Sequence, residues 1–209
     1  MNSTFNNLGD EKKDTILNAA IEEFSRHSYK SASTNRIVKN AGIGKGMLFY
    51  YFKSKKNLYL YLVDIAFNDF MENLVDFLDK SEKDLFNRIF QWNIYKIKMF
   101  IKEPQKFNFL MKISAEESPE VKNEIKRKYS LMSEKAYELL LKNIDLSNFR
   151  KDIDTEKAVN IIFWFFDSYV NKTINKLREG IHDIGHFEND TLKEFNEYLE
   201  ILSRLMTDA

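Results

Sequence analysis

The chain has 209 residues, 44% of them hydrophobic, and its 32 basic and 32 acidic side chains give a formal net charge of zero. It contains no cysteine, which excludes a disulfide framework and thiolate chemistry. The first ten residues lack the basic and apolar regions of a signal peptide, and the densest apolar run, Ile161 to Phe166, is too short to span a bilayer. We therefore expect a cytoplasmic protein with no membrane partner.

The chain has few helix-breaking residues, six glycines and two prolines, which favours long helices over strands. Apolar spacing and capping residues predict an all-α chain with helices over 10–27, 34–41, 44–52, 54–79, 81–102, 105–114, 118–143, 155–178 and 191–206. Five of these starts depend on capping signals, which are Ser33, Ser54, Ser81 with Asp84, Ser118 before Pro119, and Thr191 with Glu194. The runs "LFYYF" and "IIFWFF" have strand-like composition, but their flanks are helical, so no strand is predicted.

The segment AGIGKGMLFYYFKSKKN, residues 41–57, places three glycines before aromatic and basic residues. A phosphate-binding loop needs G-x-x-x-x-G-K-[ST] after a strand, whereas here Met47 follows Gly46 and the preceding segment is helical. The dinucleotide fingerprint G-x-G-x-x-G fails on the same grounds. A helix-turn-helix fits better, because Gly42 can end the first of two short helices in the left-handed conformation and Ile43 can fill the angle between them.

The helix over 44–52 has two unlike sides. Leu48, Tyr51 and Phe52 fall on the side expected to pack inward. The opposite side is small, aromatic and basic, with Met47 at its edge; it comprises Lys45, Gly46, Phe49 and Tyr50. Residues 34–56 carry no acid, and their basic residues are Arg36, Lys39, Lys45, Lys53, Lys55 and Lys56. Such a face suits the phosphates and thymine methyls of a DNA groove, the alternative being a solvated lysine-rich surface.

The stretch STNRIVKNAGIGKGMLFYYFKSKKNLYLYLV resembles the DNA-binding segment of the tetracycline-repressor (TetR) family of transcriptional regulators. The resemblance begins at "ILNAAIEEFSRHSYKSAS" and covers about the first 65 residues. The rest of the chain resembles the family only in length and helical character. The resemblance implies an N-terminal three-helix helix-turn-helix domain, 1–56, followed by a larger helical ligand-binding and dimerisation domain, 57–209.

The resemblance also implies which residues contact a double-stranded DNA operator. Thr34 and Lys55 stand at phosphate-contact positions, and the base-reading positions hold Lys45, Gly46 and Met47. The groove and phosphate positions of the same helix hold Phe49, Tyr50 and Tyr51. Two residues depart from the family pattern, since Gly44 stands where a capping serine is common and Met47 where threonine is common.

The middle of the chain is rich in aromatic and methionine side chains, which either fill a core or line an adaptable apolar cavity. The candidate walls of a cavity for a small, largely apolar effector are Trp92, Tyr95, Met99, Phe107 and Met111. The helix over 155–178 is apolar on more than one face, so one face can cover the core and the other a second subunit. Its candidate residues at a homodimer interface are Phe166, Tyr169 and Val170.

His182 and His186 have the spacing of helical metal ligands, but Gly180 and Gly185 indicate a loop and no third ligand is evident. With three histidines and no cysteine, no catalytic arrangement is indicated. We expect no metal, no cofactor and no enzyme activity. The favoured interpretation is a repressor that binds a near-palindromic operator as a homodimer and is released by an effector. The alternative is a helical scaffold or lipid-carrying protein with a basic interaction patch, and an enzyme is third.

Overall fold

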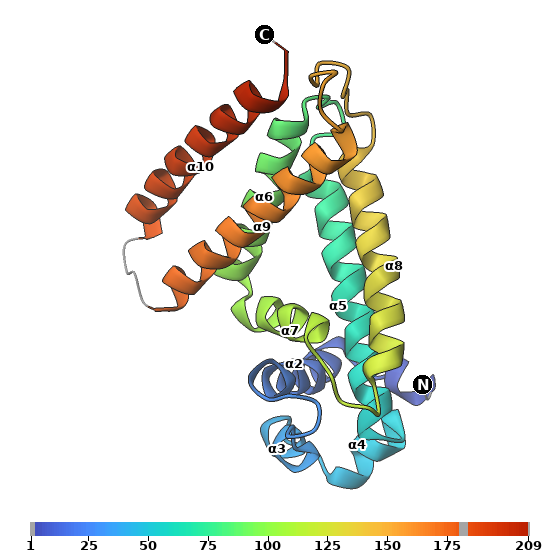
Figure 1. The fold of residues 1–209 in the computed structure, drawn as a ribbon. Helices are drawn as coiled ribbons and strands as arrows, with labels where there is room; N and C mark the ends of the chain where they lie inside the picture. The colour runs from blue at the N-terminus through green and yellow to red at the C-terminus, as the bar shows by residue number, and fades with distance from the viewer. Residues whose placement is uncertain (1–2, 180–183, 209) are drawn as a thin grey trace. The chain divides into compact units, whose positions relative to one another are not determined.

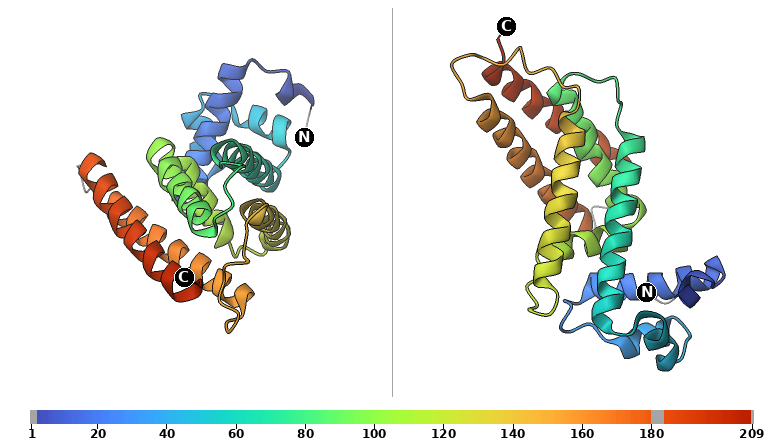
Figure 2. Two further views of the ribbon diagram at one scale, coloured as in Figure 1. Left: turned by 90° about the horizontal axis from the view of Figure 1, so that it is seen from above. Right: turned by 90° about the vertical axis from the view of Figure 1, so that its right-hand side faces the viewer.

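The computed structural model describes residues 3–179 and 184–208, and the regular elements of these residues are α-helices (Figures 1 and 2). The all-α fold predicted from the sequence is confirmed. Within the described ranges, no helix combines the length and the apolar character needed to cross a membrane. In chain order the helices are α1 (Ser3–Asn6), α2 (Asp10–Arg26), α3 (Thr34–Asn40), α4 (Lys45–Phe52), α5 (Lys55–Phe77), α6 (Leu85–Lys102), α7 (Pro104–Ser114), α8 (Lys122–Leu141), α9 (Thr155–Arg178) and α10 (Ile184–Met206).

Three predicted helix starts are wrong, because α6, α8 and α10 begin at residues other than those that the capping signals predict. Asp84 alone caps α6, where its carboxylate accepts the Asn87 N–H at 2.8 Å, whereas the Ser81 hydroxyl bonds the side chain of Asp79. The turn after Ser118 precedes α8, which begins only at Lys122. Thr191 lies inside α10, which begins seven residues earlier, at Ile184.

The chain forms two compact units, and α5, α6 and α8 each contribute residues to both. The first unit holds the described residues up to Glu72 together with Phe100–Ala136. The second holds Asn73–Met99 together with the described residues from Tyr137 onward. The helix-turn-helix therefore belongs to a compact unit that extends well beyond residue 56, and a functional boundary at 56/57 stays a prediction.

In the first unit, α7 completes the core of the N-terminal helices. α2 packs against both α3 and α7. Phe109 of α7 is fully buried, and its ring centre lies 5.7 Å from that of Tyr59 on α5. Tyr59 in turn contacts Phe24 of α2 and Tyr29 of the α2–α3 turn, with ring centres 4.8 and 5.3 Å away. The helix-turn-helix is thus anchored by aromatic packing that reaches 80 residues further along the chain.

The short helix α1, which the sequence patterns did not predict, anchors one buried aromatic residue. Phe5 is 1% exposed and packs against Tyr51 and Phe52 of α4, with ring centres 5.5 and 4.7 Å away, and against Tyr61 of α5 at 5.9 Å. Because Tyr51 and Phe52 form the inner side of α4, Phe5 supports the back of that helix.

In the second unit, α9 and α10 pack on one another. Phe166 of α9 is fully buried, and its ring centre lies 4.3 Å from that of Phe195 on α10. α9 begins at Thr155 because the Asp154 carboxylate accepts the Lys157 N–H at 3.1 Å. Lys96 of α6 is buried and pairs with Asp167 of α9 at 2.6 Å, which joins α6 to α9.

Candidate nucleic-acid interface

The turn between α3 and α4 has the geometry predicted from its glycine. Gly42 has a φ of 63°, in the left-handed region that favours glycine. Its N–H donates to the Lys39 carbonyl at 3.3 Å, and the Ile43 N–H donates to the Val38 carbonyl at 3.0 Å. This pair of bonds is the Schellman closure of a helix end. Ile43 is half-buried against the core, so it fills the angle between the two helices as expected.

α4 presents two different sides, as its sequence predicts. Leu48, Tyr51 and Phe52 are buried. Lys45, Gly46 and Tyr50 are exposed, and Met47 and Phe49 are half-buried. Gly44 precedes the helix and provides no side-chain cap.

Tyr51 is a correction to the expected set of DNA contacts. It is only 4% exposed, and its ring packs edge-on against Phe5. A ring held in this way stabilises the inner side of α4 and does not face a groove. We therefore leave Tyr51 out of the proposed contact surface.

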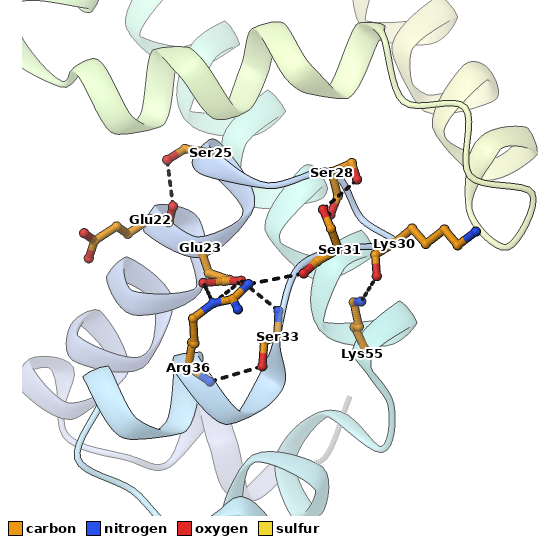
Figure 3. Close-up of polar contacts among 9 residues, drawn as sticks. All are labelled: Glu22, Glu23, Ser25, Ser28, Lys30, Ser31, Ser33, Arg36 and Lys55. Atoms are coloured by element: carbon orange, nitrogen blue, oxygen red, sulfur yellow. Dashed lines mark hydrogen bonds and ion pairs between the residues drawn. The ribbon is translucent and has the colours of Figure 1, made fainter.

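A buried carboxylate fixes the start of α3 (Figure 3). Glu23 of α2 accepts the Ser33 N–H at 2.7 Å and the Arg36 Nε at 2.9 Å. The Arg36 Nη2 also donates to the Ser31 carbonyl at 3.2 Å, and the Ser33 hydroxyl caps α3 by accepting the Arg36 N–H. Burial acts to raise the pKa of Glu23, but hydrogen bonds from Arg36 and Ser33 outweigh it and hold that pKa below its ordinary value. Arg36 therefore stabilises the start of α3, although it is an exposed residue.

Lys55, expected at a phosphate, lies at the start of α5 and contacts the α2–α3 turn. Its Nζ donates to the Lys30 carbonyl at 3.2 Å and lies 4.8 Å from the ring centre of Tyr29 (Figure 3 shows the Lys30 bond). Burial lowers the pKa of Lys55, while the nearby carboxylates of Glu120 and Glu23 oppose that shift. The contact of Lys55 with phosphate stays a prediction. In the fold, Lys55 also helps to position the α2–α3 turn.

The α2–α3 turn is also tied to the α7–α8 turn. The Tyr29 N–H donates to Glu116 at 2.8 Å, and the Tyr29 hydroxyl donates to Glu120 at 2.8 Å. Burial favours a raised pKa for Glu116, but hydrogen bonds from Ser118 and Tyr29 lower it overall. Both carboxylates therefore act as acceptors that hold the turn leading into α3.

Ion pairing divides the basic residues of 34–56, other than the half-buried Lys55, into two groups. Arg36 pairs with Glu23, and Lys56 pairs with Glu124 of α8 at 2.5 Å. Among the described residues, no carboxylate lies within ion-pair distance of three exposed lysines, which are Lys39, Lys45 and Lys53. These three provide the positive charge available to a partner. Thr34, the other expected phosphate contact, is half-buried at the first position of α3.

The five candidate walls of an effector cavity do not gather into one described cavity. Trp92, Tyr95 and Met99 belong to the second unit, where the Trp92 and Tyr95 rings stack at 6.3 Å, and Phe107 and Met111 belong to the first unit. Tyr95 and Phe107 are buried and Met111 is exposed. Their role in ligand binding stays a prediction.

The candidate dimer residues are mostly core residues, and this is a correction. Phe166 and Val170 are buried inside their own unit, and the half-buried Tyr169 donates its hydroxyl to Glu194 of α10 at 2.9 Å. The sequence shows that α9 is apolar on two faces but does not show which face the chain covers itself. The apolar face left exposed by α9 and α10 comprises Ile161, Trp164, Phe165, Ile201 and Leu205. We call it the α9–α10 face.

His182 lies outside the described residues. His186 falls within α10 instead of the expected loop, and the structure does not describe its side chain. Among the residues that are described, no three histidine or acidic side chains are grouped closely enough to hold a metal ion.

Two short helices closed by a left-handed glycine, with an exposed basic and aromatic face on the second, define a helix-turn-helix protein of the DNA-binding class. The sequence profile of the family described as "Bacterial regulatory proteins, tetR family" matches residues 16–62. Residues 16–62 therefore carry a DNA-binding segment of the TetR family of transcriptional regulators. The resemblance noted in the sequence is thereby confirmed, and the family is not one of enzymes.

Named relatives agree with this assignment. The chain is 40% identical over 60 residues to the HTH-type transcriptional regulator QacR of Staphylococcus aureus, and this match covers 29% of the chain and 32% of QacR. It is 26% identical over 160 residues to IcaR of Staphylococcus epidermidis, the HTH-type negative transcriptional regulator of the biofilm operon icaADBC, with 75% of the chain and 81% of IcaR covered. The chain thus spans about a third of the first relative and four fifths of the second.

A solved structure shares the whole fold. The crystal structure of a TetR family transcriptional regulator from Chloroflexus aurantiacus superposes with a TM-score of 0.74 at 24% identity. The superposition covers 100% of this chain and 99% of the other.

Proposed function

We propose that this protein is a transcriptional repressor that binds a near-palindromic DNA operator as a homodimer in the cytoplasm and is released by a small-molecule effector. The observation that carries the proposal is the outer side of α4, the second helix of the helix-turn-helix. It exposes Lys45, Gly46 and Tyr50 with no acidic side chain on the same helix. Gly46 has no neighbouring atom near the position of a Cβ, so the backbone is open to close approach.

These residues suit a major groove. Lys45 can donate to guanine acceptors, Met47 can contact a thymine methyl, and Tyr50 can reach a phosphate or a base edge. Lys39 and Lys53 add unpaired positive charge at the ends of α3 and α4, where phosphates of a bound duplex would lie. A solvated lysine-rich surface would not need the half-buried Phe49 or the exposed Tyr50.

A dimer supplies the second α4 that a near-palindromic operator requires. Two such helices must enter successive major grooves about 34 Å apart, or a multiple of that distance. The α9–α10 face supports dimerisation, because large contiguous apolar surfaces on soluble proteins mark interaction sites. The name of the relative IcaR, a negative regulator, supports repression over activation.

Duplexes selected from a random pool test the proposal and provide the operator probe. Binding should be sequence-selective, and log K should fall linearly with log salt, as expected when lysines neutralise phosphates. Lys45→Ala should weaken the selected duplex by about 1–3 kcal/mol and blur specificity at one or two positions. Lys135→Ala, which removes an exposed lysine of α8, is the matched control.

The alternative, a helical scaffold or lipid carrier, predicts a different outcome. A pool that yields no consensus, with salt-dependent binding equal on all duplexes, would favour that alternative. Equal losses on selected and random DNA for Lys45→Ala would remove Lys45 from the base-reading set while leaving the regulator intact.

A further inference from the structure

The second unit contains a cavity of about 460 Å³ at the ends of three helices. This volume falls within the range of small-molecule sites, roughly 300–1,000 Å³. The apolar part of its wall is Val75, Leu78 and Leu139. The charged part is cationic throughout and comprises Lys80, Arg88 and Lys142.

Arg88 is the unusual member of this set, because it is a buried cation without an acidic partner among the described residues. It is 2% exposed. Its Nη1 donates to the Leu139 carbonyl at 3.2 Å, and its Nη2 donates to the Asp79 and Glu82 carbonyls at 3.1 and 2.8 Å. Its Nε has no hydrogen-bond partner, and no described carboxylate lies within ion-pair distance of the guanidinium.

The three carbonyls explain part of this arrangement but not all of it. They show that Arg88 fastens the α5–α6 loop to the end of α8. Neutral carbonyls, however, leave the net charge of the guanidinium uncompensated, and burying an uncompensated charge is costly. An anion in the cavity would supply the missing charge and an acceptor for the free donors of the guanidinium.

Two residues whose backbone carbonyls accept from Arg88, Asp79 and Glu82, have acidic side chains that bind other groups. The Asp79 carboxylate accepts the hydroxyl and the N–H of Ser81. Those bonds hold the pKa of Asp79 below its ordinary value, and the charge of Arg88 adds a smaller contribution. The Glu82 carboxylate accepts the N–H groups of Lys83 and Asp84. Asp79 therefore offsets only part of the positive charge, and neither carboxylate lines the cavity.

We propose that this cavity binds the anionic group of a small amphiphile, a carboxylate or a phosphate attached to an apolar group. Arg88, Lys80 and Lys142 hold the anion, and the apolar group lies against Val75, Leu78 and Leu139. The family assignment does not determine this chemistry. A role of the site in releasing DNA rests in addition on the proposed function and is tested separately.

Calorimetric titration of the full chain with octanoate tests the site, with 1-octanol as the uncharged match and inorganic phosphate as the free anion. Octanoate should bind at least tenfold more tightly than 1-octanol and more tightly than phosphate, and its affinity should fall as salt rises. Replacing the two exposed cations, K80Q with K142Q, should weaken octanoate roughly 2- to 30-fold. The charge-matched control replaces two exposed lysines of the second unit away from the cavity, K151Q with K172Q, and should leave binding unchanged.

Several results would overturn the proposal. They are equal affinity for octanoate and 1-octanol, no binding of octanoate, or an octanoate affinity unchanged in the K80Q–K142Q variant. If phosphate binds as tightly as octanoate, the site is one for a free inorganic anion and not for an amphiphile. Arg88→Met should abolish binding if it folds, and the K80Q–K142Q variant decides the matter if it does not. If octanoate binds but does not release a selected operator, the binding site stands and only its role in releasing DNA is refuted.

Discussion

Two surfaces of this protein expose large aromatic side chains, and their neighbours differ. On α4, Tyr50 is 52% exposed, and the ammonium of Lys53 lies 5.6 Å from its ring centre. On α9, Trp164 is 70% exposed and shares the α9–α10 face with the apolar Ile161 and Leu205. The aromatic groups on the two surfaces are alike, so the surrounding charge indicates the partner. Cations around an aromatic ring suit a polyanion, whereas apolar neighbours suit another apolar surface.

The strongest test of this contrast disrupts the apolar α9–α10 face and leaves the basic surface of α4 unchanged. Trp164→Glu should weaken dimerisation by about 4 kcal/mol, close to a thousandfold, because buried tryptophans dominate interfaces and each dimer loses two of them. Sedimentation velocity over a concentration series measures the loss.

The control for this test is Asn148→Glu, which adds a charge at an exposed position of the α8–α9 connector. A Trp164→Glu chain that dimerises as tightly as the parent would show that the α9–α10 face has another partner. Phe166→Glu is unsuited to the test, because Phe166 is buried within its own unit and its replacement would probe folding.

The second prediction concerns the support behind α4. Phe5→Ala should cost about 2–4 kcal/mol, toward the lower part of the range for a buried phenylalanine because the short α1 can detach. Hydrogen exchange of residues 44–53 should accelerate and operator affinity should fall, while dimerisation is unchanged. Asn6→Ala, one residue on and exposed, is the control. Unchanged exchange in α4 would show that α1 is only an appendage.

The third prediction concerns the carboxylate beneath α3 and its dependence on pH. Glu23→Gln should cost about 1–3 kcal/mol at pH 7, because it removes the charge that pairs with Arg36. The pKa of Glu23 is lower in the folded chain than in the unfolded one, so its contribution is present above pH ~4.3 and is lost as pH falls through the folded pKa. Urea unfolding of both proteins at pH 7 and pH 3 measures this.

The stability gap between the parent and Glu23→Gln should therefore shrink at pH 3. Glu22→Gln, which affects only the exposed pair with Arg26, should change stability little at either pH. A gap of equal size at both values would mean that the glutamate acts through packing and not through its charge.

The smallest effects come from the turn itself and have opposite signs. Gly42→Ala should cost about 1–2 kcal/mol, because a side chain at a φ of 63° is strained. Gly44→Ser should gain a few tenths of a kcal/mol by capping α4, where no side chain now does so. Thermal unfolding of the two variants side by side would separate them, and a destabilised Gly44→Ser would show that the serine cannot reach the N–H groups of α4.

The sequence by itself determined the helix-turn-helix, because that unit depends on short-range interactions. The left-handed Gly42, the Ser33 cap and the spacing of Leu48, Tyr51 and Phe52 act within a few residues, and the ends of α3 and α4 lie within one residue of the predicted ends. The same local features led to the family resemblance that the comparisons confirm.

Only the tertiary structure decided which charges and which apolar faces remain available. The pairing of Arg36 with Glu23, and of Lys56 with Glu124, joins residues that no local pattern connects. The packing of Phe5 behind α4 depends likewise on α1 docking against α4 and α5. Phe166 illustrates the physical reason, since a helix with two apolar faces has one sequence pattern whichever face it buries. The choice depends on where α10 packs, and no periodicity within α9 contains that information.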